Sequence, residues 1–475
     1  MIHQFKNNGY NIVLDVNSGA VHVVDDLAYD IIEMYENNTR GSIISAMVEK
    51  YIKPEHMSCI TSQDGNKEDF SEHVEELVNQ INEVMDDIEE LKKDGALFTR
   101  DIYEDYIKDF KQRSTVVKAL CLHIAHDCNL ACKYCFAEEG EYKGHRELMS
   151  YEVGKQALDF LIANSGNRKN LEVDFFGGEP LMNFQVVKDL VKYAREQEAI
   201  HNKKFRFTLT TNGILLDDDV MEFANREMSN VVLSIDGRKE VNDRMRPSRN
   251  GKGSYDVILP KFQKFATSRN QTNYYVRGTF THNNLDFSED VKHLAELGFQ
   301  QISVEPVVAL PEEPYAITEE DLPKLYEEYD KLAAYMLEKR KEGKDFNFFH
   351  FMIDLTGGPC VAKRLSGCGS GTEYLAVTPW GDLYPCHQFV GIDEFRLGNV
   401  WKGIEKSELK EEFKQCNVYS KDKCKSCFAK FFCSGGCAAN SFKFHGDINN
   451  AYDIGCALQK KRVECAIMLK AAFEN

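Results

Sequence analysis

The chain has 475 residues, of which 43% are hydrophobic, enough for a sizeable core and, at about 150 residues per domain, for two to four domains. Its formal net charge of -18 argues against a nucleic-acid partner, because binding to phosphates needs a positive surface. No apolar run approaches the ~20 residues of a membrane span, and the first residues lack a signal-peptide pattern. We therefore expect a cytoplasmic protein without a membrane partner, whose fifteen cysteines bind metal rather than form disulfides.

Residues 1–105 are predicted to form a separate unit. Apolar residues alternate on both sides of "NSG" at 17–19, which indicates a β-hairpin. Two short helical patterns, a loop at 58–69, a long amphipathic helix ending at Gly95 and a short strand follow. This order resembles a winged-helix peptide-binding module, and without a basic surface a protein or peptide partner is favoured over DNA. A structural cap on the N-terminus is the alternative.

Strand and helix patterns alternate from residue 116 onward, which predicts a parallel sheet with right-handed crossovers. Six strands are expected, fewer than the eight of a closed barrel, so the fold class is α/β with a partial (β/α)6 barrel over 106–317. The expected strands are 116–125, 171–176, 205–211, 231–236, 273–281 and 301–307. A charged helix over 318–352 is expected to bridge two domains. Residues 353–475 are rich in Cys and Gly, so bound metal would stabilise this last domain.

Three cysteines follow the first strand of the expected barrel. Cys128, Cys132 and Cys135 have the spacing C-x3-C-x2-C, and soft thiolates suit an iron-sulfur cluster or zinc. Three ligands on a cluster of four irons leave one iron open to a small molecule, whereas a zinc site with a water is the alternative. The spacing resembles that of the radical SAM family. The resemblance implies a 4Fe-4S cluster whose open iron binds S-adenosylmethionine, which is cleaved to a 5'-deoxyadenosyl radical.

Further motifs lie at the ends of the later strands and resemble those that contact S-adenosylmethionine in that family. "GGEP" contains two glycines that let backbone approach a ligand, and a Glu that can accept hydrogen bonds from an amine. Arg277 is a charge inside an apolar strand, and the methionyl carboxylate is a candidate partner. The expected cofactor-binding residues are Tyr134, Phe136, Gly177, Gly178, Glu179, Thr211, Asn212, Ser234, Asp236 and Arg277.

The cysteines of the last domain occur in the order C-x12-G-x4-C, then C-x2-C-x5-C-x3-C, then a final Cys. Taken alone, this region could also be interpreted as a zinc ribbon. The order resembles the SPASM domain. That resemblance implies two auxiliary 4Fe-4S clusters, hence three in all. The first cluster would be held by Cys368, Cys386 and Cys437, and the second by Cys424, Cys427, Cys433 and Cys456. Cys360 could supply the missing fourth ligand of the first cluster, although we favour an open iron that receives a substrate thiolate.

The order of the three parts, and the segment 367–391 in particular, resembles the SCIFF maturases. The resemblance implies a thioether crosslink in a Cys-rich precursor peptide whose leader binds the N-terminal domain, with a flavodoxin- or ferredoxin-like external reductant. One alternative is an anaerobic sulfatase maturase that forms formylglycine, in which an acidic residue follows the cysteine equivalent to Cys386. Here that residue is His387, which could itself titrate near neutral pH. A non-catalytic iron-sulfur protein is the other alternative. Cys59, Cys121, Cys416 and Cys465 fit no motif and are expected to be buried free thiols.

Overall fold

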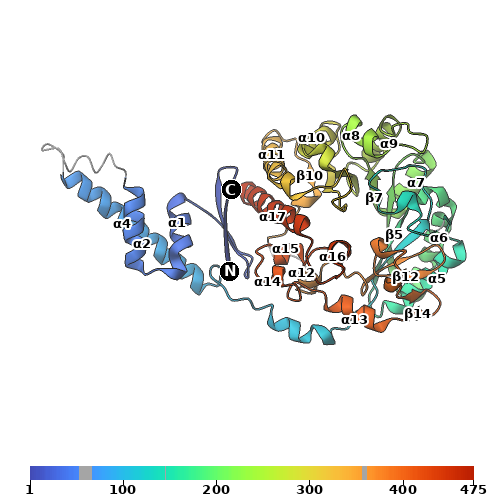
Figure 1. Cartoon of the computed structure of the whole chain (residues 1–475), viewed down its shortest axis with the longest axis horizontal. Helices are drawn as coiled ribbons and strands as arrows, with labels where there is room; N and C mark the ends of the chain where they lie inside the picture. The colour runs from blue at the N-terminus through green and yellow to red at the C-terminus, as the bar shows by residue number, and fades with distance from the viewer. Residues whose placement is uncertain (53–66, 145, 356–360, 475) are drawn as a thin grey trace. The chain divides into compact units, whose positions relative to one another are not determined.

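The computed structural model describes residues 1–52, 67–144, 146–355 and 361–474. The chain forms two compact units, one of residues 1–104, 353–358 and 463–475 and one of residues 105–352 and 359–462 (Figure 1). Residues 463–475, assigned above to the last domain, therefore group with the N-terminal unit. None of the described helices is long and apolar enough to cross a lipid bilayer. The expected loop at 58–69 and two of the cysteines, Cys59 and Cys360, lie wholly or largely outside the described residues.

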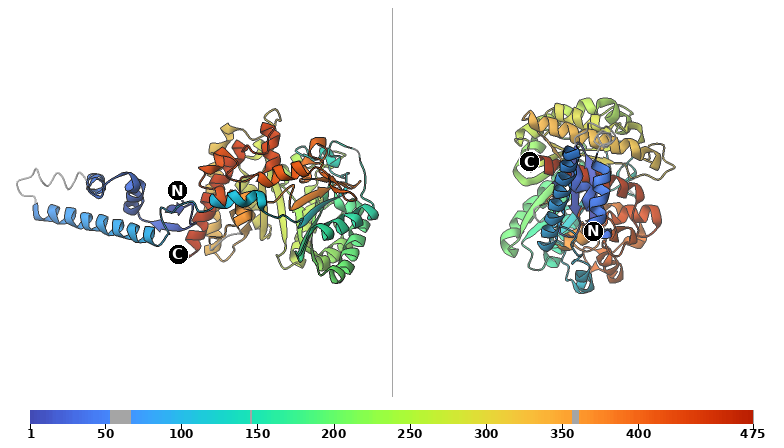
Figure 2. Two further views of the ribbon diagram at one scale, coloured as in Figure 1. Left: turned by 90° about the horizontal axis from the view of Figure 1, so that it is seen from below. Right: turned by 90° about the vertical axis from the view of Figure 1, so that its left-hand side faces the viewer.

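The first unit joins a small antiparallel sheet to a group of helices. The sheet order is β1-β2-β3, so β3 is an edge strand, and the expected hairpin corresponds to β2 and β3. No strand occurs at 96–98, where a short one was expected. Both α1 and α2 pack on the long helix α4 (Figure 2). The elements are β1 (Ile2–Asn7), β2 (Tyr10–Asp15), β3 (Val21–Val24), α1 (Asp26–Met34), α2 (Arg40–Tyr51) and α4 (Lys67–Lys93).

Helix ends and core of this unit follow from its sequence. Asp25 caps α1 by accepting a hydrogen bond from the backbone N–H of Ala28, and Thr39 caps α2 in the same way through Ser42. Gly95 ends α4 with a positive φ of 72°, a conformation that glycine adopts without strain. The core contains Val13, Ile31, Ile43, Met47, Ile81, Met85, Ile88 and Leu97, all almost fully buried.

The second unit contains an 11-stranded sheet whose order is β10-β9-β8-β7-β6-β5-β4-β11-β12-β13-β14. All six expected strands are present, and β4 to β9 are parallel neighbours in chain order, which confirms the α/β class. The strands are β4 (Ala119–Ala125), β5 (Asn170–Gly177), β6 (Lys204–Thr211), β7 (Met228–Ser234), β8 (Tyr274–Phe280), β9 (Gln301–Pro306), β10 (Asn347–Phe348), β11 (Tyr374–Val377), β12 (Asp382–Tyr384), β13 (Gly398–Asn399) and β14 (Gly403–Ile404).

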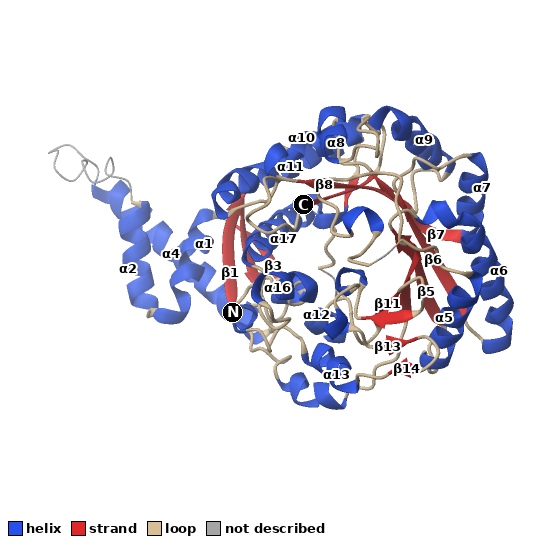
Figure 3. Cartoon of the chain, turned by 45° about the vertical axis from the view of Figure 1, so that its right-hand side comes forward, coloured by secondary structure: helices blue, strands red, loops and turns tan. Residues whose placement is uncertain are grey.

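The sheet is curved, and the helices of the alternating region lie on its outer side (Figure 3). Every residue of β4 is buried, as expected for a central parallel strand covered on both faces. The helices are α5 (Tyr151–Asn164), α6 (Phe184–His201), α7 (Asp218–Glu227), α8 (Lys239–Met245), α9 (Tyr255–Ser268), α10 (Phe287–Glu296), α11 (Leu322–Lys341), α12 (Val361–Ser366), α13 (Ser407–Gln415), α14 (Asp422–Lys425), α15 (Lys430–Cys433), α16 (Ala438–His445) and α17 (Asp453–Glu474).

The helix expected to bridge two domains, α11, instead packs on α10 within the second unit. It buries an apolar side that includes Leu325, Tyr329 and Leu332. The Cys-rich segment adds β11 to the parallel sheet beside β4, so this segment continues the sheet of the alternating region. The carboxyl ends of β4 to β9 therefore share one edge with the loops that carry the motifs.

Candidate active site

The three-cysteine loop is held by backbone hydrogen bonds. Ala131 N–H donates to the carbonyl oxygen of Pro247 at 2.8 Å, and Lys133 N–H donates to that of Met245 at 2.9 Å. These bonds fix the loop against the segment after α8. Burial raises the pKa of Cys128, and a hydrogen bond from the backbone N–H of Leu130 opposes the shift. The charges of Glu179, Cys132 and Cys135 raise this pKa further, as expected for three thiols that lie close together.

The thiols are not ready-made thiolates in the metal-free protein. Burial raises the pKa of Cys128 to about 12 and that of Cys132 to about 11, the latter despite the charge of Arg246. Metal must therefore displace the thiol protons, so binding depends on pH. The described residues contain no group of three or more His, Cys, Asp or Glu placed for a single metal ion.

The two glycines of "GGEP" lie against the cysteine loop. A Cβ atom on Gly177 would be 2.3 Å from the carbonyl oxygen of Ala125, and one on Gly178 would be 2.2 Å from that of Asp127. The backbone N–H groups of Gly178 and Glu179 donate to these same oxygens at 2.8 and 2.9 Å. In the structure the glycines thus permit close approach of the loop backbone, whereas a ligand was expected there.

Glu179 connects "GGEP" to "TTNG". Its carboxylate has no exposed surface and accepts three hydrogen bonds, from the backbone N–H of Leu181, the hydroxyl of Thr211 and the backbone N–H of Asn212. Burial raises its pKa to about 7, although these bonds oppose the shift. The side-chain amide of Asn212 in turn donates to the sulfur of Cys128 at 3.6 Å, so the network ends on a cysteine of the set.

A second buried network lies on the other side of the set. The hydroxyl of Tyr134, an aromatic expected near adenine, donates to Asp236 at 2.7 Å and accepts from Arg246 at 2.9 Å. Asp236 also accepts from the backbone N–H of Thr279, and burial raises its pKa to about 6. The Nε of Arg246 is buried and has no hydrogen-bond partner among the described residues. A buried donor without a partner is costly, which makes this atom available to a ligand.

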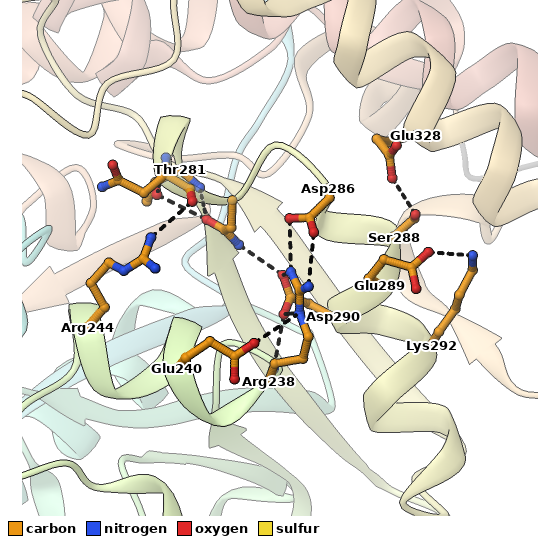
Figure 4. A network of polar contacts seen from close by, with 12 residues as sticks. Arg238, Glu240, Arg244, Thr281, Asp286, Ser288, Glu289, Asp290, Lys292 and Glu328 are labelled. Carbon is orange, nitrogen blue, oxygen red and sulfur yellow. Dashed lines mark hydrogen bonds and ion pairs between the residues drawn. The ribbon is translucent and has the colours of Figure 1, made fainter.

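The loop after β7 is fixed by an ion-pair network beyond Asp236 (Figure 4). Arg238 pairs with Asp290 at 2.8 Å and with Asp286 at 2.9 Å. Gly237 has a φ of 136°, and a Cβ there would be 2.3 Å from that of Asp290, so only glycine fits this turn. Asn284 donates to Asp290 at 3.0 Å and connects the network to the end of β8. The network therefore positions the loop that carries Asp236.

Arg277 lies on β8 beside Ser234 of β7 in the strand register. Its guanidinium pairs with Glu305 of β9 at 3.0 Å, so a protein carboxylate is its partner in this structure. Burial raises the pKa of Glu305, but Arg277, His350 and Arg462 outweigh burial and lower it to about 2. The side chain of Arg277 is 46% exposed and can still contact a ligand.

The side chain of Phe136 is 47% exposed. The centroid of its ring is 5.5 Å from that of the His387 ring. His387 contacts Phe176 as well, at 5.0 Å. Burial, followed by the charge of Arg277, lowers the pKa of His387 to about 4. This pKa lies below the neutral range in which His387 was expected to titrate.

The C-terminal cysteines fall into two groups by mutual interaction. Burial raises the pKa of Cys386, and the charges of Cys437 and Cys368 raise it further. Burial also raises the pKa of Cys433, and the charges of Cys456, Cys424 and Cys427 raise it further. The structure thus brings Cys368 together with Cys386 and Cys437, and Cys424 together with the remaining three. Of the cysteines outside the motifs, Cys121 and Cys465 are buried and Cys416 is half-buried.

Residues 117–259 match the family described as a 4Fe-4S single cluster domain. An uncharacterized protein of Methanocaldococcus jannaschii is 28% identical over 319 residues, 66% of this chain and 96% of that protein. A cysteine-type anaerobic sulfatase-maturating enzyme of Clostridium novyi is 24% identical over 66% of this chain and 86% of its own. The radical SAM cyclopropyl synthase TigE of Paramaledivibacter caminithermalis is 22% identical, covering 72% of each chain.

Two solved structures have a similar fold. That of anSMEcpe with bound AdoMet and the Cp18Cys peptide matches with a TM-score of 0.63 and 21% identity, over 75% of this chain and 99% of that one. Streptococcus suis SuiB bound to S-adenosylmethionine matches with a TM-score of 0.52 and 16% identity, over 96% of this chain and 98% of that one. SuiB bound to precursor peptide SuiA gives a TM-score of 0.51 over 94% of this chain. The chain therefore has the fold of these two structures.

The donor set of this chain fits a 4Fe-4S cluster, the group that the matched family description names, and an anionic ligand beside it. Three thiols lie together at the carboxyl end of β4, which suits a cluster with one open iron. The unpartnered Nε of Arg246 suits an anionic group of a bound ligand. Sequence reasoning missed Arg246 because it lies in a charged segment, "NDRMRPSRN", in which no pattern distinguishes a buried arginine from exposed ones.

Proposed function

We propose that this protein is a radical S-adenosylmethionine enzyme that installs an intramolecular thioether crosslink in a Cys-rich ribosomally synthesised precursor peptide. The crosslink would join a cysteine sulfur to a carbon of another residue. The observation that carries the proposal is the grouping of ten cysteines into three sets in one unit, the first of which lies beside the buried Arg246. A flavodoxin- or ferredoxin-like reductant and a cytoplasmic location complete the proposal.

Cys128, Cys132 and Cys135 would hold the cluster that cleaves S-adenosylmethionine, which supplies the deoxyadenosyl radical when both are bound. Arg246 would hold an anionic group of the ligand. Tyr134 and Asp236 keep the guanidinium in place through their hydrogen bond and ion pair, the latter at 3.9 Å. Asn212 would donate to a ligating sulfur, as it donates to Cys128 in the metal-free protein.

The reaction removes two hydrogens from the peptide. The hydrogen of the C–H bond leaves as an atom with deoxyadenosine, the thiol hydrogen leaves as a proton, and the remaining electron passes to an oxidised centre as the C–S bond forms. The two C-terminal cysteine sets would hold auxiliary clusters that can accept this electron. The first set contains three described cysteines, so its fourth ligand would be either Cys360 or the substrate thiolate that we favour.

The first unit would bind the leader of the precursor by strand addition to β3, the edge strand of its sheet. A groove of about 460 Å³ lies along this edge. It is lined largely by apolar side chains, which suit the alternate residues of an extended peptide; these include Val21, Val23, Ile32, Val84, Ile88, Leu91 and Leu97. The side chain of Val23 is 43% exposed on the edge strand.

The alternative is an anaerobic sulfatase-maturating enzyme that forms formylglycine, as the name of the Clostridium novyi relative indicates for that protein. One observation weakens this alternative, and a second supports a precursor peptide as the substrate. His387 follows Cys386 in place of an acidic residue, and burial keeps it neutral. The match to anSMEcpe leaves a quarter of this chain without a counterpart, whereas the match to SuiB, solved with a precursor peptide, includes nearly all of it.

The test is mass spectrometry of a precursor peptide after anaerobic incubation with S-adenosylmethionine and reductant. A thioether removes two hydrogens and protects one cysteine from alkylation by iodoacetamide. Formylglycine instead replaces the sulfur by an aldehyde oxygen, which reacts with hydrazines. Detection of the aldehyde, or of a peptide whose cysteines all remain alkylatable, would contradict the proposal.

A further inference from the structure

Lys421 is a buried cation in the Cys-rich segment. It precedes α14, and its residue surface is 2% exposed. The ammonium group donates to the carbonyl oxygen of Gly435 at 2.9 Å and to the hydroxyl of Ser441 at 3.5 Å. The hydroxyl of Ser441 also donates to the carbonyl oxygen of Cys437 at 3.0 Å. Because Gly435 lies midway between Cys433 and Cys437, the ammonium lies where the chain passes from one cysteine set to the other.

The neighbouring lysines are paired in the usual way. Lys423 forms an ion pair with Asp453, and Lys425 forms one with Asp422 at 2.9 Å. Among the described residues, no carboxylate lies within ion-pair distance of Lys421. Lysine is rarely buried unless a counter-charge accompanies it, since desolvation of an ammonium group is costly.

Cysteine sulfurs of both sets lie around Lys421, and they would become anionic as ligands of a cluster. Burial raises the pKa of Cys437 of the first set, and the charge of Lys421 makes a smaller contribution that lowers it. This charge acts in the same way on Cys424 of the second set. Burial raises the pKa of a third thiol, that of Cys416, and Lys421 opposes this shift. Lys421 and Cys416 also line a small cavity together with Cys368, the remaining exposed cysteine of the first set.

We propose that Lys421 is the shared counter-ion of the two auxiliary clusters and raises the reduction potential of both. The inference rests on the proposed function, because it requires that the two sets hold clusters. Reduction adds a negative charge to a cluster, and a nearby buried cation favours the more negative state. Lys421 would thereby keep the auxiliary clusters able to accept the electron that the crosslink releases.

The test is a redox titration of the reconstituted full-length protein, followed by electron paramagnetic resonance, in wild type and Lys421→Met. The Lys421→Met variant is expected to keep its iron. The reduction potentials of both auxiliary clusters should fall by at least 59 mV, which corresponds to a tenfold change for a one-electron couple. The cluster of Cys128, Cys132 and Cys135 should keep its potential. Lys421→Arg retains the charge and should shift the auxiliary potentials less than Lys421→Met.

The matched control is Lys430→Met, which removes another buried lysine of the same segment. Lys430 is 3% exposed, and its ammonium lies over the rings of Tyr419 and Phe431. Lys430→Met should leave the potential of the first auxiliary cluster unchanged and shift that of the second less than Lys421→Met does, because Lys430 is not among the charges that act on Cys424 or Cys433. If Lys421→Met does not fold, Lys421→Gln replaces it, because an amide can still donate to Gly435.

The outcomes separate the inference from the proposed function. A wild-type protein that binds only about four irons, one cluster, would contradict the auxiliary clusters themselves. A wild type with about twelve irons whose auxiliary potentials do not change in the neutral Lys421 variants would contradict the role of Lys421 alone. Equal shifts in the Lys421 and Lys430 variants would also contradict that role.

Discussion

The carboxyl group of Glu179 is fully buried, and burial moves its pKa from 4.5 to about 7. A carboxyl whose pKa is raised on folding stabilises the folded state below pH 4.5, and this stabilisation is lost as the pH rises through about 7. In protein prepared without metal, the stability of Glu179→Gln should not decrease over this pH range through ionisation at position 179. The free energy of unfolding of wild type relative to the variant should fall by about 3 kcal/mol between pH 4.5 and 7.

Denaturant titrations of both proteins at several pH values measure this difference. Asp174 and Asp236 also have pKa values raised by burial to about 6, and they remain in both proteins, so they cancel in the comparison. A difference that is constant with pH would show that the pKa of Glu179 does not change on folding, which contradicts the shift caused by burial.

Arg246 is the residue for which we predict the largest effect on cofactor binding. Arg246→Gln removes the charge beside Cys132 and leaves Asp236 without its cation. A hydrogen bond to a charged group contributes about 1.5–3 kcal/mol, so affinity for S-adenosylmethionine should fall at least about tenfold. Equilibrium binding to the reconstituted protein measures the change.

Arg244→Gln is the control, since Arg244 is exposed on α8, two residues before Arg246, and its hydrogen bond among the described residues goes to the backbone carbonyl of Asn283. Equal affinity of wild type and Arg246→Gln would assign the arginine a purely structural role.

At the residue scale the sequence indicates the cysteines by their spacing. It does not show that Arg246 is buried, because burial depends on contacts with Tyr134 and Asp236, which are remote in the chain.

At the scale of elements, β3 carries the proposed leader site. Val23→Asp places a charge on the edge of an apolar groove and should weaken binding of the precursor at least about tenfold, because the charge must be desolvated when the peptide covers it. Cleavage of S-adenosylmethionine without peptide should continue unchanged. Fluorescence anisotropy with a labelled leader peptide gives the affinity.

Ile200→Asp is the matched control, since Ile200 is 69% exposed on α6 in the other unit. It should bind the precursor as wild type does. Equal affinities of all three proteins would favour a structural cap at the N-terminus. Equal losses in both variants would place the effect outside the groove.

The six central strands could be predicted because each is a short apolar run between helical patterns. The strands β1 and β10 to β14 could not, for two physical reasons. In β1 only Phe5 and Asn7 are buried, so it lacks a clear alternation. The strands β10 to β14 have two to four residues each, too few to show a period. The helix α17 was missed because it buries consecutive residues from Cys465 to Leu469 and so has no polar face there.

At the scale of the whole molecule, the first unit combines segments from both ends of the chain. His3 pairs with Glu464 at 2.9 Å, and the amide of Asn7 donates to the sulfur of Cys465 at 3.7 Å. No local sequence pattern predicts such contacts, since each end alone resembles an ordinary strand or helix. Deletion of residues 1–105 should therefore expose buried apolar residues of α17, including Ile467 and Met468.

We expect the deleted protein to aggregate more than the point variant Val23→Asp, because it leaves an exposed apolar helix face. Size-exclusion chromatography with light scattering tests this. A monomeric deletion variant with wild-type unfolding behaviour would show that the contacts between the two ends contribute little to stability.

The most direct test of the central claim is the formation of deoxyadenosine by the reconstituted protein, measured together with its iron content. Wild type with S-adenosylmethionine and reductant should form deoxyadenosine and hold about twelve irons, four per cluster. Replacing Cys128, Cys132 and Cys135 by Ala should abolish deoxyadenosine and remove about four irons, whereas Cys121→Ala, on the preceding strand β4, should change neither. Stoichiometric zinc without iron, or deoxyadenosine formation that survives the triple substitution, would contradict the account.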